Sequence, residues 1–232
     1  MGAADAPRNL RASGKRGMGL LTQFRQNQIN ANDAAIDRHD QLFRQYLEHV
    51  DAETWREDSG RRITILARSP ASPVVKAFVG RQEDLKLRNI GARIIVARLE
   101  PESELRRMAR ALSELVDDAD VGALVRWASN DCILDAHEQL ILGSQMCWSG
   151  DAMRREPGKR DSLDLFERDA PGTVRLGVLA FDAIWSVAVK VPTSRLGLRR
   201  PAKPVGGLAP QPGTALPKPA FLAGGSPAAT RH

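Results

Sequence analysis

The sequence predicts an α/β fold, with a mixed, mainly parallel β-sheet sandwiched between helices. The apolar runs ITIL, IIVA and LIL lack polar alternation, as expected of strands that are covered on both faces. Amphipathic helical segments separate the first strands, and such connections allow neighbouring strands to run parallel. The 232 residues, 42% of them hydrophobic, suffice for one domain with appended ends.

Composition divides the chain into four parts. Residues 1–16 are predicted to be a disordered basic N-terminus, 17–57 a helical segment, and 58–192 the α/β domain. Residues 193–232 carry seven Pro and six Gly and are predicted to be a disordered basic tail. With so few apolar side chains, this tail cannot offset the entropy of ordering.

The helical segment shows apolar residues at helical spacing, from Ala35 to Val50. Asn32 is the expected N-cap of this helix, and a shorter helix is expected from about Leu20 to Ile29. His39 and His49 are interpreted as ordinary residues of the helix surface or the edge of the core.

The first half of the α/β domain alternates strand and helix. RRITILARS is the first predicted strand, and a helix follows from Pro73 to about Asn89. After Gly91, ARIIVARLE is the second strand. Pro101 opens the helix ESELRRMARALSELV, whose apolar side chains form one stripe. VGALVRWA is the third strand.

The second half is predicted to begin with a hairpin. DCILD and EQLILG are its strands, and the turn falls at Asp135-Ala136-His137. A short helix is expected from about Ser149 to Arg155, then a charged loop, a sixth strand SLDLFE, and a helix from about Gly172 to Val189. Pro192 ends this last helix.

The formal charge of +6 comes entirely from the ends of the chain. Residues 1–16 contribute +3 and residues 193–232 contribute +6, so the intervening body carries −3. A nucleic-acid-binding domain concentrates positive charge on its folded face, and this body does not. Binding to nucleic acid or to an anionic membrane is therefore expected only weakly and through the tails.

Other classes of protein are disfavoured by what the sequence lacks. The N-terminus does not resemble a signal peptide, and no apolar run approaches the roughly 20 residues needed to span a bilayer. Cys132 and Cys147 are expected to be reduced thiols in a cytoplasmic protein. Two Cys and four scattered His show no metal-ligand spacing, so neither a metal nor a cofactor is predicted.

The order of elements over residues 61–190, with a hairpin that leads into Gly143-Ser144, resembles one repeat of the phospholipase D superfamily. Members of that family carry His-x-Lys, an Asp five residues beyond the Lys, and Gly-Ser-x-Asn a few residues later. The sequence FDAIW at 181–185 also resembles the Phe-x-x-x-Trp near the end of such a repeat. The resemblance implies phosphodiester chemistry and pairing of two repeats at a shared interface.

Carried over residue by residue, the motif is degenerate. Asp135 takes the Asp position, Asn130 the Lys position and Ala128 the nucleophilic His position, while Met146 replaces the final Asn of Gly143-Ser144-x-Asn. Without the imidazole nucleophile and the Lys charge, family-type hydrolysis is not expected. No residue is assigned a catalytic role.

Other reactive side chains are interpreted as ordinary. His137 is expected to be a solvated turn histidine, and Cys132 and Cys147 are expected to be inert core thiols. The acidic cluster Asp117, Asp118 and Asp120 is interpreted as a solvated turn. Weak anion binding remains a hypothesis for Gly143, Ser144 and Asn130, if a helix begins at Gly143-Ser144.

Three functions stay open. The first is a non-catalytic phospholipase D-like protein that acts as an interaction or regulatory scaffold, through self-association or a protein partner, with a phosphate-containing ligand as an option. The second is an unorthodox phosphodiesterase or phospholipid-cleaving enzyme. The third is a nucleic-acid-associated regulator that binds through the basic tails.

Overall fold

The computed structural model describes residues 14–52, 61–116, 120–154 and 163–197. The described residues belong to one compact unit. Most of both predicted disordered ends lies outside the described residues. Within the described residues, no helix combines the length and the apolar character needed to cross a membrane.

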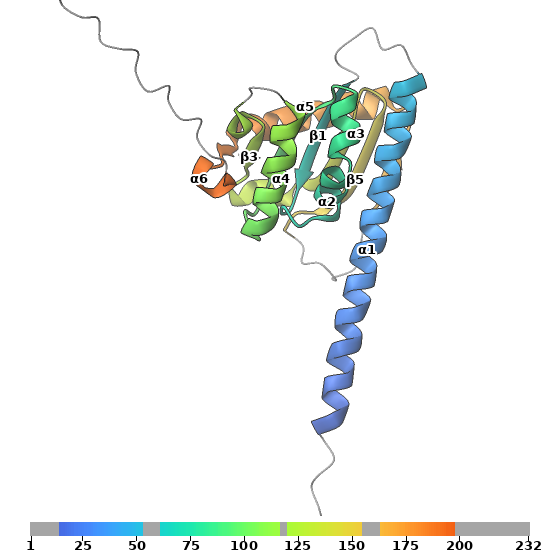
Figure 1. The fold of residues 1–232 in the computed structure, drawn as a ribbon, viewed down its shortest axis with the longest axis vertical. Helices are drawn as coiled ribbons and strands as arrows, with labels where there is room; N and C mark the ends of the chain where they lie inside the picture. The colour runs from blue at the N-terminus through green and yellow to red at the C-terminus, as the bar shows by residue number, and fades with distance from the viewer. Residues whose placement is uncertain (1–13, 53–60, 117–119, 155–162, 198–232) are drawn as a thin grey trace, which may run out of the picture. The chain divides into compact units, whose positions relative to one another are not determined.

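In the described part of the chain, the sheet has seven strands in the order β6-β5-β4-β1-β2-β3-β7 (Figure 1). Its centre is formed by β1 (Arg62–Ala67), β2 (Gly91–Val96) and β3 (Val125–Trp127), and these strands run parallel. The other strands pair antiparallel: β4 (His137–Leu142), β5 (Met146–Ala152), β6 (Leu165–Glu167) and β7 (Val189–Lys190).

The fold is therefore α/β with a mixed sheet, but the prediction of a mainly parallel sheet is not confirmed. Only two of the six strand pairings are parallel. The physical reason lies in the connections, because a helix joins β1 to β2 and β2 to β3, whereas a tight turn joins β4 to β5 and requires antiparallel strands.

One face of the sheet packs against the first four helices. These are α1 (Gly14–Ala52), α2 (Pro73–Gly80), α3 (Gln82–Leu87) and α4 (Glu102–Leu115), and Figure 1 shows α2, α3 and α4 together on this side. Alternate residues of β1 point to this face, so Ile63 and Ile65 share a core cluster with Phe43 and Phe78. The apolar stripe predicted for α4 is confirmed, since Leu105, Met108 and Leu112 are fully buried.

The other face packs against α5 (Pro171–Val187). Phe181 is buried with Leu66 and Ile95, and Val174 is buried with Ile141. The helix comes close to β4 at Gly177, where an added Cβ would lie 2.8 Å from Nε2 of Gln139. Val174 and Phe181 are seven residues apart, so helical spacing places them on the same side of α5.

Two arginines and two aromatic rings reinforce the contact between α5 and the sheet. The guanidinium carbon of Arg93 lies 5.2 Å from the ring centre of Trp185 and 5.3 Å from that of Phe181. Arg126 lies 4.8 Å from Trp185 and donates to its carbonyl oxygen at 2.9 Å. Arg93 also pairs with Asp182 at 2.8 Å. The positive charges are thus held by ring faces, a carboxylate and a carbonyl.

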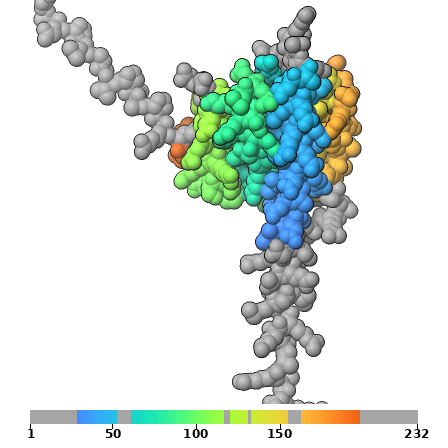
Figure 2. All heavy atoms as spheres, turned by 45° about the vertical axis from the view of Figure 1, so that its right-hand side comes forward, coloured from blue at the N-terminus to red at the C-terminus, as the bar shows by residue number. Residues whose placement is uncertain are grey.

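The N-terminal helix differs from its prediction. Asn32 lies inside α1, which is one helix of 39 residues rather than two. Ala31, Ala34 and Ala35 lie close to Asn32 in the sequence. The high helix propensity of alanine favours continuation of the helix through Asn32. Figure 2 shows α1, in blue, against the α2–α3 region.

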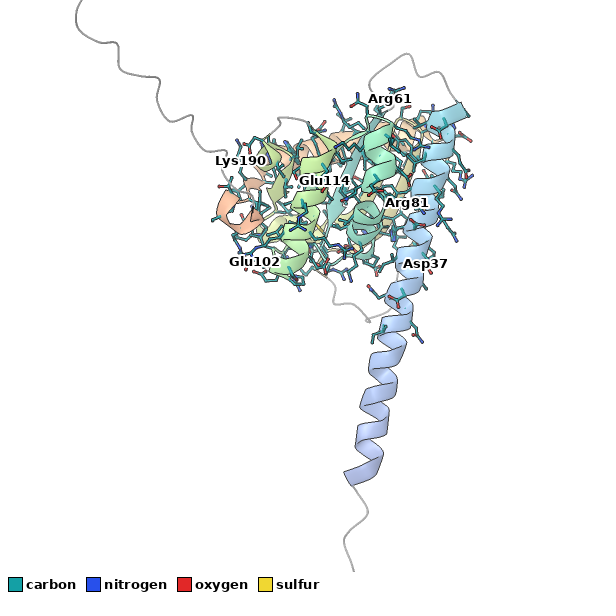
Figure 3. All side chains as sticks on the ribbon, viewed as in Figure 1. Asp37, Arg61, Arg81, Glu102, Glu114 and Lys190 are labelled. Carbon is teal, nitrogen blue, oxygen red and sulfur yellow. The ribbon has the colours of Figure 1, made fainter. Side chains whose placement is uncertain are left out.

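Ion pairs hold α1 to its neighbours. Arg81, labelled in Figure 3 at the corner between α2 and α3, donates through Nη2 to Asp40 at 2.7 Å. Arg88 donates in the same way to Asp51 at 2.7 Å. Bidentate arginine–carboxylate pairs fix direction as well as distance, so they orient α1 along α2 and α3.

Several local predictions are wrong. DCILD is a 3-10 helix (Asp131–Asp135), not a strand, and the segment expected as a helix from Ser149 belongs largely to β5. Only Val125–Trp127 of the third predicted strand is extended, because Val121–Ala123 forms a 3-10 turn. The predicted tail begins with a short helix, α6 (Thr193–Leu196), in which Leu196 is buried.

A core substitution in α1 tests whether this helix belongs to the folded unit. Phe43 is fully buried, so Phe43→Ala is expected to lower the free energy of unfolding by about 3–5 kcal/mol. Gln41→Ala, at an exposed position of the same helix, is the control and should change it by less than about 0.5 kcal/mol. Urea denaturation measures both, and equal effects would contradict the packing of α1.

Candidate functional site

The predicted anion-binding residues Gly143 and Ser144 lie in the turn between β4 and β5. Gly143 adopts a positive φ of 62° and donates its N–H to the carbonyl of Arg62 at 3.0 Å. Met146 is the first residue of β5. No helix begins at this turn, so the expectation of a helix N-terminus here is wrong, and anion binding by these residues remains an untested prediction.

The other motif positions lie at the opposite end of the sheet. Ala128 follows β3 and donates its N–H to the carbonyl of Val96, where β2 ends. Because β4 runs antiparallel to β1, Gly143 instead lies beside the start of β1. The structure therefore does not bring Asn130 together with Gly143 and Ser144, and Asp135 is also on the far side, just before β4.

The hairpin of the structure lies at other residues than the predicted one. Since β4 and β5 are its strands, the first strand begins with His137-Glu138-Gln139. If the resemblance is counted from this hairpin, the His, Lys and Asp positions of the family motif fall on His137, Gln139 and Ser144. His137 is exposed, and its Nδ1 lies 2.8 Å from the carbonyl of Gly150. Neither Gln139 nor Ser144 carries a charge.

The thiol of Cys147 is buried among Ile141 and Val174. Burial raises its pKa, and this keeps the thiol protonated and a poor nucleophile. The side chain of Cys132 and residues Asp117 and Asp118 lie outside the described residues. Asp120 accepts the N–H of Gly122 at 3.0 Å, which is the local role expected of a turn.

A cleft of about 770 Å³ lies at the carboxyl end of β1. Its walls come from α1, the connection between β1 and α2, β4, β5 and the residues before β6. In α/β sheets, ligands bind outside the carboxyl ends of the parallel strands. Position and size therefore make this cleft the candidate functional site.

Glu138 is one of the residues that line the cleft. It is 9% exposed, and its Oε1 accepts the backbone N–H of Arg68 at 2.9 Å and the hydroxyl of Ser72 at 2.8 Å. Ser72 precedes the first turn of α2. The carboxylate thus occupies the place beside a helix start where an α/β fold would otherwise hold a phosphate group.

The guanidinium of Arg68 faces the backbone of β5 and the residue that follows it. Its Nε donates to Met153 at 3.1 Å and its Nη2 to Ala152 at 3.2 Å, while Glu138 Oε2 is 3.9 Å away. Arg68 therefore ties β5 to the end of β1, and its donors are largely engaged by the protein itself.

His39 closes the cleft on the α1 side. It is 5% exposed, and burial lowers its pKa below the ordinary value, so the ring is neutral near pH 7. Its Nδ1 lies 2.6 Å from the carbonyl of Ala35, and since a carbonyl only accepts, Nδ1 carries the proton. The ring meets Trp148 edge-on at 4.4 Å, and Trp148 in turn donates to Asp164 at 2.7 Å.

The sequence signals for this site were present but were not used. In EQLIL, Glu138 shares the inward side of the strand with Leu140 and Leu142, an uncommon place for a carboxylate. His39 occupies a position in the apolar stripe of its helix, which predicts burial rather than a surface role. The described residues contain no group of three or more His, Cys, Asp or Glu that could hold a metal ion.

Comparisons of this chain with protein-family models, with curated proteins and with solved structures gave no match. The chemistry of the cleft and of the sheet faces is therefore the basis for inferring function.

His39 generates a prediction for pH dependence. Its pKa is lower in the folded protein than in the unfolded chain, so between these two values the unfolded chain binds more protons. Stability should therefore fall as the pH drops below about 6.5. The Tm of the wild type should decrease between pH 7 and pH 5, and His39→Leu should flatten that decrease.

His137→Gln is the control, because His137 is exposed. The Tm of His137→Gln should change with pH as steeply as that of the wild type over the same pH range. Hydrogen bonding to Arg81 lowers the pKa of the Asp40 carboxyl in the folded protein. Above pH 5 this carboxyl is therefore ionised in both the folded and the unfolded chain and does not contribute to the change of stability with pH. Identical slopes for the wild type and His39→Leu would show that this ring is not buried in its neutral form.

Proposed function

We propose that this chain is a non-catalytic interaction protein on a phospholipase D-like α/β scaffold, and that it self-associates through α5. The order of strand, helix, strand, helix, strand, hairpin and closing helix supports the scaffold. The uncharged Gln139 and Ser144 at the Lys and Asp positions of the hairpin support the absence of catalysis.

The observation that carries self-association is the outer face of α5. Leu176, Leu179 and Val187 are 69%, 61% and 65% exposed, although the opposite face of the same helix is buried on the sheet. Successive residues of a helix are about 100° apart, so these three side chains lie on one stripe. Apolar stripes of this kind mark protein contact sites.

The stripe also has a self-complementary pattern of sizes. Three small residues, Gly172, Ala180 and Ala183, lie on it together with the three large ones. An antiparallel pair of α5 helices, related by a two-fold axis between positions 179 and 180, sets Leu179 against Ala180, Leu176 against Ala183 and Val187 against Gly172. Large side chains then face small ones at every level, which suits the isologous contact of a symmetric dimer.

Light scattering coupled to size exclusion tests this interface. The wild type is expected to elute with a mass near twice 25.4 kDa at tens of micromolar. Leu179→Arg should yield a monomer, because each dimer would place two cations in an apolar contact. Leu87→Arg on α3, which replaces a side chain that is 82% exposed, is the matched control and should stay dimeric. A monomeric wild type would refute the proposal.

One observation favours phosphodiester cleavage as a second function. His137 stands at the start of β4 with Nδ1 near a carbonyl, and donation by Nδ1 leaves Nε2 with a free lone pair for attack on phosphorus. The missing Lys charge argues that the rate is negligible.

Turnover of bis-p-nitrophenyl phosphate separates the two functions. We expect wild type, His137→Ala and the double variant His137→Ala/Cys147→Ala to show the same background rate. A wild-type rate at least tenfold above that of His137→Ala would establish the enzyme and overturn the non-catalytic proposal.

A further inference from the structure

The cleft at the carboxyl end of β1 has features that the proposed self-association does not use. It lies on the α1 side of the sheet, whereas α5 packs on the other face. We propose that this cleft binds a small organic cation, whose primary ammonium or guanidinium group is held by Glu138 and its neighbouring carboxylates. This inference is independent of the dimer.

The charge balance of the cleft favours a cation. Three carboxylates, of Glu138, Asp151 and Asp164, line it together with two guanidinium groups, of Arg38 and Arg68. Among the described residues, these are the acidic and basic side chains of its lining, apart from the neutral ring of His39. One negative charge is therefore in excess.

Arg38 opposes a bound cation less than its charge suggests. Its side chain is 62% exposed and pairs with Asp164 at 2.6 Å, so its charge is screened by solvent at the rim. Arg68 directs its Nε and Nη2 donors at backbone carbonyls. The side chains of Glu138 and Arg68 are only 12% and 13% exposed, so their two charges are screened equally little.

An unfilled hydrogen-bond acceptor in the lining favours a ligand that donates. Nε2 of His39, whose side chain is buried, has no hydrogen-bond partner. Oε1 of Glu138 accepts from two donors, and its Oε2 lies 3.9 Å from Nη2 of Arg68, beyond hydrogen-bond distance. Buried acceptors without donors are costly, and an ammonium or guanidinium supplies several N–H groups at once.

The rest of the wall suits a short hydrocarbon chain. Ala35, Ala71, Val74 and Leu163 line the cleft beside these polar groups. A volume of about 770 Å³ falls within the range of about 300–1,000 Å³ typical of small-molecule sites. A phosphate-containing ligand is disfavoured, since the carboxylate of Glu138 already takes the donors that such an anion would need.

Isothermal titration calorimetry on the full chain tests the inference with agmatine, which has an ammonium and a guanidinium joined by four methylenes. We expect saturable binding that weakens with added salt. The neutral analogue 1,4-butanediol and inorganic phosphate should bind at least tenfold more weakly. Agmatine that fails to bind, or that binds no better than butanediol, overturns the proposal, and so does tighter binding of phosphate.

Variants locate the binding. Glu138→Gln keeps the acceptor for Arg68 and Ser72 but removes the charge, and it should weaken agmatine binding at least tenfold. Glu102→Gln on α4 (labelled in Figure 3), a residue that does not line the cleft, is the matched control and should bind like the wild type. Unchanged affinity in folded Glu138→Gln would refute the site.

A second variant keeps the test decisive if Glu138→Gln does not fold. Ala35 lies on α1 and lines the cleft, so Ala35→Phe places a ring in the space without altering Glu138. Loss of agmatine binding with an unchanged circular dichroism spectrum supports the cleft as the site. Retained binding in this variant contradicts it. Neither result depends on the oligomeric state, so failure here and failure of the dimer can be told apart.

Discussion

The antiparallel pairing of β4 with β1 is the constraint on which the rest of this structure depends. It sets Leu66 opposite Gln139, so Glu138 comes next to the connection between β1 and α2. There its carboxylate accepts hydrogen bonds from the backbone N–H of Arg68 and the hydroxyl of Ser72, and it thereby links β4 to the start of α2. A shift of one residue in the pairing register of β4 with β1 would exchange the two faces of β4, and Glu138 would then point toward α5.

The two faces of the sheet have different roles because of this register. On one face, α1 covers the cleft with His39, whose neutral ring packs against Trp148. On the other, α5 lies over Ile141 and Ile95 and leaves a second apolar stripe outward. The cleft and the exposed apolar stripe of α5 thereby lie on opposite sides of the sheet.

Sequence reasoning located most of the helices and strands but misplaced the hairpin. The predicted strand DCILD is a 3-10 helix, and β5 was taken in part for a helix, because short apolar segments have no periodicity that separates strand from helix. Because of this error, Gly143-Ser144 was expected at the start of a helix, whereas it lies in a turn. The same error concealed that the first strand of the hairpin begins at His137.

The sequence by itself determined the α/β class, the central strands, and the buried stripe of α4, because each depends on hydrophobic periodicity within one segment. Tertiary structure alone decided which strands are neighbours, and hence that Ala128 and Gly143 lie at opposite ends of the sheet. It also decided that Glu138, His39 and Arg68 share one cleft. These residues are far apart along the chain, and only the strand order and the packing of α1 bring them together.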